Sequence, residues 1–216
     1  MSAVRMEFQR RGIVYCSIRP LPLLATKVPT FKCTYNGNGI SLAGISFNPQ
    51  STAELELPLV GNKITITGTV TMAGGKVTGL GHIYFANNST FTWTGGTIDN
   101  AFDLGDAQGI NVTTTISGAG TKKLPGFIFN YGTITWTDSG RIDMATLGSI
   151  SNYGTFDIRG DGTIAGASGW VANSGTFKKT LGTGTTTINS TAHLDLDFLI
   201  FVSSPPERRC SEGSQG

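Results

Sequence analysis

Side chains that could carry acid–base chemistry are few and scattered in this sequence. Its two histidines, His82 and His193, lie near opposite ends of the central region, residues 61–190. Enzymatic cleavage of a glycosidic bond needs two carboxylates that flank that bond. Asp157 aligns with threonines in the neighbouring repeat units described below, so no column of acids forms there. We therefore predict no catalytic residue, no cofactor and no metal site.

Three acids fall close together in the segment "DNAFDLGD", namely Asp99, Asp103 and Asp106. Carboxylate oxygens at this density are ligands that Ca²⁺ prefers. Their spacing fits neither an EF-hand loop nor the nonapeptide calcium repeat. We interpret the segment as a solvated loop.

The tripeptide Arg159-Gly160-Asp161 is one that some cell-surface receptors recognise. Within the repeat it stands at a strand end, where Thr137-Asp138 stands one unit earlier. Glycines such as Gly160 and Gly162 are typical of turns. A turn therefore explains the tripeptide without a receptor.

The charge composition argues against nucleic acids and anionic membranes as partners. Only 14% of the residues are charged, and the formal net charge is +2. A basic surface of the kind that nucleic acids need is not expected at this balance. The apolar run "FLIFV" at 198–202 is far shorter than the roughly 20 residues that span a bilayer as a helix. We expect no nucleic-acid partner and no membrane span.

The three cysteines, Cys16, Cys33 and Cys210, all lie outside residues 61–190, so they are not part of the repeated framework. An odd number of cysteines cannot pair completely within one chain, and the spacing fits no zinc site. Two alternatives stay open: a Cys16–Cys33 bridge, or three unpaired thiols.

A recurring motif indicates how the chain is organised. The strings "NYGTI", "NYGTF" and "NSGTF" begin at residues 130, 152 and 173, and a shorter copy, "NSTF", occupies 88–91. The apolar residues that close these copies are Phe91, Ile134, Phe156 and Phe177, at intervals of 43, 22 and 21 residues. The long interval is two periods, which predicts a hidden copy at Val112, and one period before Phe91 lies Val70. A fixed period of this length is typical of a solenoid.

Further columns follow the same register. They comprise Met72, Trp93, Thr114, Trp136, Ile158 and Lys179; Val77, Ile98, Ile142, Ile164 and Ile188; Ala86, Ile128, Ile150 and Val171; and the asparagines Asn88, Asn130, Asn152 and Asn173. Apolar and polar residues alternate between them, as they do in half-buried strands. Gly132, Gly154 and Gly175 follow the asparagines, where we expect turns with positive φ.

These patterns predict an all-β fold, a right-handed parallel β-helix of about six coils of 21–22 residues. We assign residues 52–197 to the solenoid, residues 1–51 to an irregular N-terminal segment or cap, and residues 198–216 to a final strand and tail. Stacking at about 4.8 Å turns each column into a ladder. An antiparallel β-sandwich would also give alternating strands, but not one column of equivalent residues per period.

Two polar columns flank the first apolar column and are expected to face outward. They are Thr69, Thr90, Asn111, Thr133, Thr155 and Thr176 on one side, and Thr71, Thr92, Thr113, Thr135, Asp157 and Lys178 on the other. We take these threonines as the candidate exposed binding face. Parallel threonine columns can match an ice lattice, although threonine is also the ordinary polar residue of an exposed strand. Glycans and other surface proteins are equally suitable partners.

The strings "FTWTGGTI", "NYGTFDIRGDGTI" and "NSGTFKKTLGTGTTTI" resemble repeats of large bacterial surface and secreted proteins. Those proteins are described as β-strand-repeat, autotransporter-like or filamentous-haemagglutinin-like, and the resemblance covers roughly residues 60–190. It implies an elongated protein that is extracellular or at the cell surface. Members are typically much longer, which implies that this chain is a fragment.

The resemblance implies a non-enzymatic structural or adhesive module, because many of these proteins are adhesins or cell-wall proteins. The location rests on the repeat type, since the apolar run after Arg11 is short and is closed by Arg19. A carbohydrate-active β-helix enzyme, a polysaccharide lyase or glycoside hydrolase, is the main alternative. The sequence does not match the paired-Asp and Gly-His-Gly motifs of polygalacturonase-like enzymes. Ice binding through the threonine columns is a third hypothesis.

Overall fold

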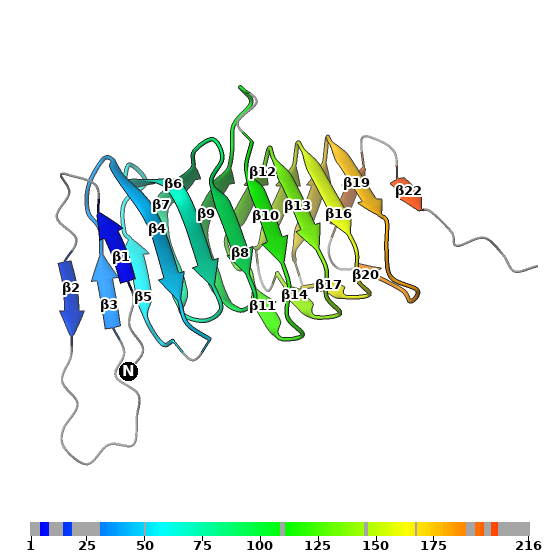
Figure 1. Ribbon diagram of the computed structural model, residues 1–216, viewed down its shortest axis with the longest axis horizontal. Coiled ribbons are helices and arrows are strands. Elements are labelled where there is room, and N and C mark those ends of the chain that lie inside the picture. Colours follow the sequence, from blue (N-terminus) through cyan, green and yellow to red (C-terminus); the bar gives the residue numbers. More distant parts are fainter. Residues whose placement is uncertain are drawn as a thin grey trace, which may run out of the picture.

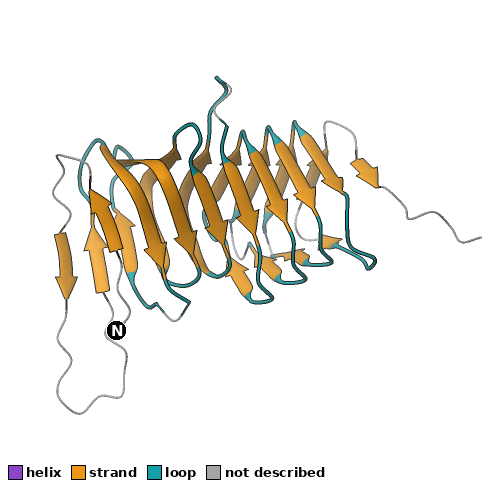
Figure 2. Cartoon of the chain, in the orientation of Figure 1, coloured by secondary structure: helices purple, strands orange, loops and turns teal. Residues whose placement is uncertain are grey.

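A computed structural model describes residues 5–8, 15–18, 31–49, 51–108, 111–144, 147–166, 168–188, 193–196 and 200–202. Within these ranges every regular element is a strand (Figure 2). The strands form a parallel β-solenoid of about seven turns. The front strands run down the page as the chain advances from left to right, so the coil is right-handed (Figure 1). The predicted fold class is therefore confirmed, and no described segment is a helix able to cross a bilayer.

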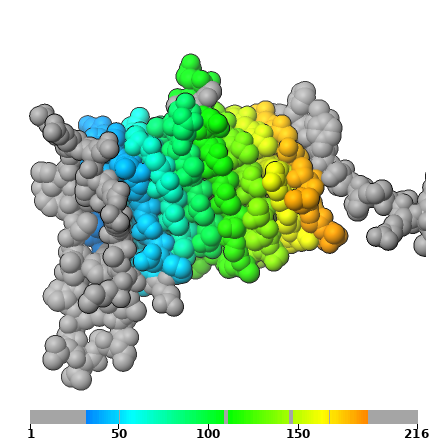
Figure 3. Space-filling model, viewed as in Figure 1, coloured from blue at the N-terminus to red at the C-terminus, as the bar shows by residue number. Residues whose placement is uncertain are grey.

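Each complete turn crosses three faces. The first, here called the threonine face, contains the second halves of β4 (Ile40–Phe47) and β6 (Lys63–Met72), followed by β8 (Thr90–Trp93), β10 (Thr113–Ile116), β13 (Thr133–Trp136), β16 (Thr155–Ile158), β19 (Thr176–Lys179) and β22 (Ile200–Val202). Neighbouring strands pair in parallel. In the space-filling view the coils lie side by side as successive bands of colour (Figure 3).

The second face, here called the charged face, carries acids and bases that pair between strands. It contains β3 (Phe31–Thr34), β5 (Glu54–Leu57), the first halves of β7 (Lys76–Phe85) and β9 (Gly96–Leu104), then β11 (Thr121–Lys123), β14 (Arg141–Asp143), β17 (Thr163–Ala165) and β20 (Thr187–Ile188). Lys32 lies 2.9 Å from Glu56, and Lys76 lies 3.0 Å from Asp99.

The third face, here called the aromatic face, closes each turn. It contains the first halves of β4 and β6, the second halves of β7 and β9, and then β12 (Phe127–Asn130), β15 (Ser149–Asn152), β18 (Trp170–Asn173) and β21 (His193–Leu196). Strands β21 and β22 pair in parallel with β18 and β19.

Two antiparallel strands stand at the N-terminal end of the solenoid. β1 (Arg5–Phe8) pairs antiparallel with β4, and β2 (Tyr15–Ile18) pairs antiparallel with β3. Parallel pairing already begins at Lys32, upstream of the boundary at residue 52 that the repeat suggested. Because an antiparallel strand cannot continue the coil, β1 and β2 end two of the ladders and cover edges that would otherwise invite pairing.

Cys33 lies in one of these terminal pairs and takes part in a disulfide. In the antiparallel β2–β3 ladder, the residue opposite Cys33 is Cys16. The alternative of three unpaired thiols is therefore wrong.

The first apolar column is confirmed as an internal ladder, with one correction. Val70, Phe91, Ile134, Phe156 and Phe177 are each at most 5% exposed. The member between Phe91 and Ile134 is not Val112, however. Thr114 pairs with Phe91 on one side and Ile134 on the other. Ile116 then occupies the second column between Trp93 and Trp136. Thr114 was wrongly placed in that column because the search for a closing apolar residue shifted this coil by two.

The third and fourth predicted columns are wrong in part, because the turns differ in length. Lys122 pairs with Gly96 on one side and Ile142 on the other, so Ile98 and Ile142 are two residues out of register. Residues 117–121 separate Ile116 from Lys122, whereas only residues 94–95 separate the paired positions Trp93 and Gly96 of the preceding coil. In the fourth column, Phe102 pairs with Ile128 and with Ile83. Ala86 therefore does not belong to it.

The asparagine column is a buried hydrogen-bonded ladder. Asn130 Nδ2 donates to Asn152 Oδ1 at 2.6 Å, and Asn152 Nδ2 donates to Asn173 Oδ1 at 2.6 Å. Asn130 pairs with Leu104, so the asparagines continue an apolar column of earlier coils. Asn88 was wrongly included, since it is exposed and has a φ of 63°.

The glycines after these asparagines are required by close packing and not by positive φ. None of Gly132, Gly154 and Gly175 is among the residues with positive φ. A Cβ on Gly154 would instead overlap the carbonyl of Gly132, and one on Gly175 would overlap the carbonyl of Gly154. The expected position was therefore right and the expected reason wrong.

Candidate functional site

Aromatic side chains gather on the outer surface of the aromatic face. Its outward positions are occupied by Lys63, Thr65, His82, Tyr84, Ala101, Asp103, Phe127, Phe129, Ser149, Ser151, Trp170 and Ala172. The rings of His82 and Tyr84 stack at 5.5 Å between centroids, and those of Phe127 and Phe129 at 6.4 Å. Phe127 and Trp170 are each 44% exposed. The face therefore presents two rows of rings to solvent.

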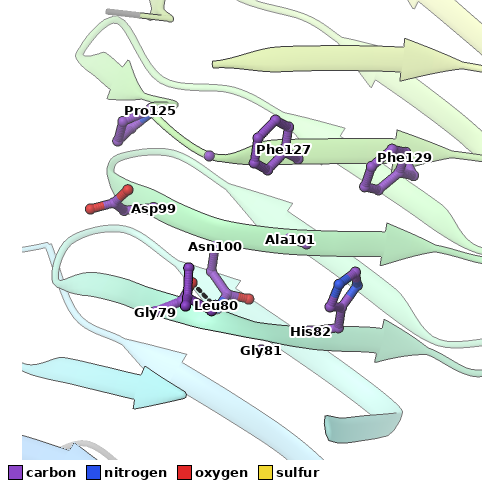
Figure 4. Close-up of a pocket in the computed structure, with 11 residues that line it drawn as sticks. Gly79, Leu80, Gly81, His82, Asp99, Asn100, Ala101, Pro125, Phe127 and Phe129 are labelled. Carbon is purple, nitrogen blue, oxygen red and sulfur yellow. Dashed lines mark hydrogen bonds between the residues drawn. The ribbon is translucent and has the colours of Figure 1, made fainter. Parts of the chain in front are cut away.

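A recess lies between these two rows, above Ala101. Ala101 pairs with His82 of β7 on one side and Phe127 of β12 on the other. Adjacent strands are about 4.8 Å apart, so the backbones that carry His82 and Phe127 are roughly 9.6 Å apart, with a single methyl group between them. The result is an open cavity of about 370 Å³ (Figure 4).

The local sequence deepens one side of this recess. Between Thr78 and His82, strand β7 has the three residues 79–81, where β9 has only Asn100 between Asp99 and Ala101. The bulge pushes Leu80 outward, leaving it 65% exposed. Leu80 and His82 thus form one wall, while Pro125 and Phe127 belong to the opposite wall (Figure 4).

Asn100 at the base of the recess holds a buried oxygen without a partner among the described residues. The side chain is 3% exposed. Its Nδ2 donates to the carbonyls of Thr78 at 3.3 Å and Gly79 at 3.0 Å, but Oδ1 accepts no hydrogen bond. Buried polar atoms are nearly always satisfied, so this acceptor needs a donor that the described residues do not supply, such as a water molecule or a ligand.

An acid–imidazole pair borders the same recess. The Nδ1 atom of His82 lies 2.8 Å from Oδ2 of Asp103, one strand away. Burial raises the pKa of the Asp103 carboxyl, although its hydrogen bond to His82 acts in the opposite direction. Burial, with a smaller effect of the Asp103 charge, also raises the pKa of Tyr84. The pair fixes the imidazole ring by one nitrogen and leaves the other, Nε2, for a further partner.

The threonine face keeps most of the predicted binding residues together. Thr69, Thr90, Thr113, Thr133, Thr155 and Thr176 form one continuous column, and Thr71, Thr92, Thr115 and Thr135 form the second. Two assignments are corrected. Thr113 belongs to the first column in place of Asn111, and Thr115 takes the place of Thr113 in the second column. The cause is again the two-residue shift of this coil.

The corrected register makes the array more regular than the sequence predicted. Four successive coils present a Thr-x-Thr pair, and Thr69 and Thr90 share a hydrogen bond of 3.0 Å between their Oγ1 atoms. The second column then changes to Asp157 and Lys178. Asp157 is only 2% exposed and its Oδ2 lies 2.8 Å from Nε of Arg159, so the face becomes charged at this end.

The acids considered as a calcium cluster do not converge. Asp99 pairs with Lys76, Asp103 with His82, and Asp106 Oδ1 accepts the backbone N–H of Gln108. Residues 96–104 form strand β9, so Asp99 and Asp103 do not lie in a loop as predicted. No group of acids, histidines or cysteines within the described ranges could hold a metal ion.

The Arg159-Gly160-Asp161 tripeptide is held by internal contacts. Arg159 binds Asp157, while Asp161 Oδ1 lies 2.6 Å from Nζ of Lys179. The Arg159 and Asp161 side chains are thus paired with different partners within the solenoid. This arrangement agrees with the interpretation of a structural turn.

Comparison with known proteins adds no relative. No family model matches the chain, and neither the curated proteins nor the solved structures contain a match.

Sequence reasoning missed the recess on the aromatic face. His82 was examined only as a catalytic residue, and Phe127 and Phe129 were not singled out. The available signal was the alternation "HIYF" at 82–85 and "FIFN" at 127–130, which places rings on the outer side of two strands. Only the strand register shows that Ala101 separates them.

Proposed function

We propose that this chain is a non-enzymatic structural or adhesive module of a bacterial surface or secreted protein. The observation that carries the proposal is the parallel stacking of equivalent positions from coil to coil, which includes the asparagine ladder. Such stacking gives a stiff, quasi-one-dimensional body whose faces are long and repetitive, which suits a spacer that displays binding surfaces.

The disulfide of Cys33 supports an extracellular or cell-surface location. Disulfides persist in oxidising compartments and are rare in the cytosol. Cys33 belongs to the antiparallel β2–β3 pair at the end of the solenoid, where protection of an edge is most useful.

A direct test combines adhesion with turnover. The full chain, immobilised on beads, should retain cells or glycan-coated surfaces, and should release no product from plant or bacterial polysaccharides. Turnover that is abolished by Asp157→Asn or Asp161→Asn would establish the enzyme alternative. Absence of both adhesion and turnover would leave a purely structural module, whose rod-like shape small-angle X-ray scattering should show.

Ice binding is a second candidate, favoured by the four complete Thr-x-Thr rungs. Stacked strands repeat at about 4.8 Å, so the hydroxyl and methyl groups form a two-dimensional lattice. Thermal hysteresis should be measured for the wild type, for Thr115→Lys within the lattice, and for Thr97→Lys on the charged face. Hysteresis lost only in the Thr115 variant would support ice binding, and no hysteresis in the wild type would exclude it.

A further inference from the structure

We propose that the recess above Ala101 is a binding subsite for one uncharged pyranose ring of a glycan. This inference deepens the proposed adhesive role and rests on it. It assigns that role to the aromatic face and not to the threonine columns that the sequence suggested.

The dimensions of the recess select one ring. Contact between carbon atoms occurs at about 3.5–4 Å, so a ring held on both sides needs walls about 7–8 Å apart. His82 and Phe127 stand on alternate strands whose backbones are roughly 9.6 Å apart, a spacing that leaves room for one ring but not for two stacked rings. The cavity of about 370 Å³ lies at the small end of ligand sites in proteins.

The walls and the base differ in chemistry. Leu80, Pro125 and Phe127 offer apolar surface, whereas Asn100 and Asp99 offer oxygen atoms that accept hydrogen bonds. A pyranose has the matching combination, with C–H groups on its ring faces and hydroxyl donors around its edge. The Oδ1 of Asn100 is a buried acceptor without a partner among the described residues, so a hydroxyl donor would satisfy it through a bridging water or after a small shift of the side chains that cover it.

The charges around the recess disfavour acidic sugars and phosphates. Among the described residues that line it there is no lysine or arginine, while Asp99 lines it and Asp103 stands between the two aromatic rows. Lys76 is already paired with Asp99 at 3.0 Å. An anion would therefore meet the Asp99 carboxylate while the neighbouring cation is already engaged, so an uncharged ring is preferred.

The most direct variant fills the recess. Ala101→Leu enlarges the side chain between His82 and Phe127 at a position that is only 7% exposed. Its matched control is Ala172→Leu, the same change on the same face but outside the recess. Phe127→Ala removes one wall, and Asp99→Asn removes the charge that excludes acidic sugars.

Binding should be measured with the full chain on an array of glycans that end in neutral, amino or acidic sugars, followed by titration calorimetry with the strongest neutral ligand. Ala101→Leu and Phe127→Ala should each weaken affinity about tenfold or more, equivalent to about 1.4 kcal/mol. Ala172→Leu should change it less than about twofold, and thermal unfolding should show that all variants fold. Asp99→Asn should allow acidic sugars to bind.

Each remaining outcome decides against a named part of the proposal. Wild-type chain that binds no neutral sugar overturns the subsite. Equal affinity of Ala101→Leu and wild type overturns its location, and preference for acidic sugars or apolar peptides overturns the ligand class. If bead adhesion persists in Ala101→Leu while sugar binding was never detected, the adhesive role stands and this subsite alone fails.

Discussion

The Nζ atom of Lys122 lies 3.0 Å from Oδ2 of Asp138, and the Lys122 side chain is fully buried. The next coil has Ile142 at the paired position. The carbonyls of Gly118 and Gly120 also accept from Nζ, at 2.5 and 3.2 Å. The Lys122 ammonium thus lies inside the solenoid, at a position that later coils fill with isoleucine.

We predict that Asp138→Ala destabilises the solenoid by about 3–5 kcal/mol, because it leaves the buried ammonium without its counter-charge. Asp138 Oδ1 also accepts from Trp136 Nε1 and the Gly140 N–H, so these bonds are lost as well. Urea unfolding followed by tryptophan fluorescence measures the change. Lys122→Met combined with Asp138→Asn should recover most of the loss, since no buried charge then remains. If Asp138→Ala alone is as stable as the wild type, the ion pair is not buried in solution.

Replacement of Thr114 by valine should stabilise the protein. Thr114 is 1% exposed, and its Oγ1 has no hydrogen-bond partner within the described structure. An unsatisfied buried hydroxyl costs about 1–3 kcal/mol, and valine has nearly the same shape. Thr114→Val should therefore raise the free energy of unfolding by about 1 kcal/mol or more, measured by urea denaturation. Thr113→Val on the exposed column is the control, and an equal gain there would attribute the effect to strand propensity.

Thr114 and Lys122 also explain where sequence reasoning reached its limit. The period, the parallel solenoid and five of six members of the first ladder followed from apolar residues such as Phe91 and Ile134, which the structure buries. The coil between them places polar side chains inward, so a search for apolar anchors selected Val112 and shifted that coil. Turn lengths could not be predicted because hydrophobic periodicity does not count residues outside the strands.

The candidate sites were predictable to different degrees. Thr-x-Thr pairs are local in sequence, and most of them were identified. The recess depends on which residues of three separate strands come into register, and on the smallness of Ala101 between His82 and Phe127. A bulge at residues 79–81 sets that register, and the sequence does not reveal it.

Asn152 occupies the middle of the asparagine ladder, and its loss should be more costly than that of a ladder end. Its Oδ1 accepts from Asn130, and its Nδ2 donates to Asn173 Oδ1 and to the Thr176 carbonyl at 3.1 Å. Buried groups that lose partners each cost about 1–3 kcal/mol, so Asn152→Ala should destabilise by about 3 kcal/mol or more. Asn130→Ala should cost less, because Asn130 Oδ1 has no hydrogen-bond partner among the described residues. Equal unfolding midpoints in urea for both variants would argue that the ladder is not cooperative.

Gly154 should not tolerate even a methyl group. A Cβ there would overlap the backbone carbonyl of Gly132, and backbone cannot move aside without breaking the coil stacking. We predict that Gly154→Ala destabilises by about 2–4 kcal/mol, in the range of overpacked or strained core substitutions. Gly61→Ala is the control, because its nearest neighbour, Asn38 Oδ1, is at an ordinary 3.7 Å. Similar melting temperatures for the two variants would contradict the close approach between coils.

The turn between β19 and β20 should loosen in acid, because the carboxylate of Asp161 holds it. Asp161 Oδ1 pairs with Lys179 Nζ at 2.6 Å, and its Oδ2 accepts the Gly184 N–H at 3.0 Å. The hydrogen bond from Lys179, followed by that from Gly184, lowers the pKa of Asp161 below its ordinary value. Stabilisation by the ionised group is therefore present above about pH 4 and is lost as the pH falls through the lowered pKa.

Amide hydrogen exchange measured by NMR tests this pH dependence, with rates corrected for the intrinsic effect of pH. Protection of the Gly184 amide should fall as the pH drops from about 5 to 3, a window set by the lowered carboxyl pKa. In Asp161→Asn the protection should be lower at pH 5 and should change little on acidification. The Gly175 amide donates to the carbonyl of Asn152 and should stay protected throughout. Parallel loss of protection at both amides would mean that acid opens the whole coil, and that Asp161 does not control this turn.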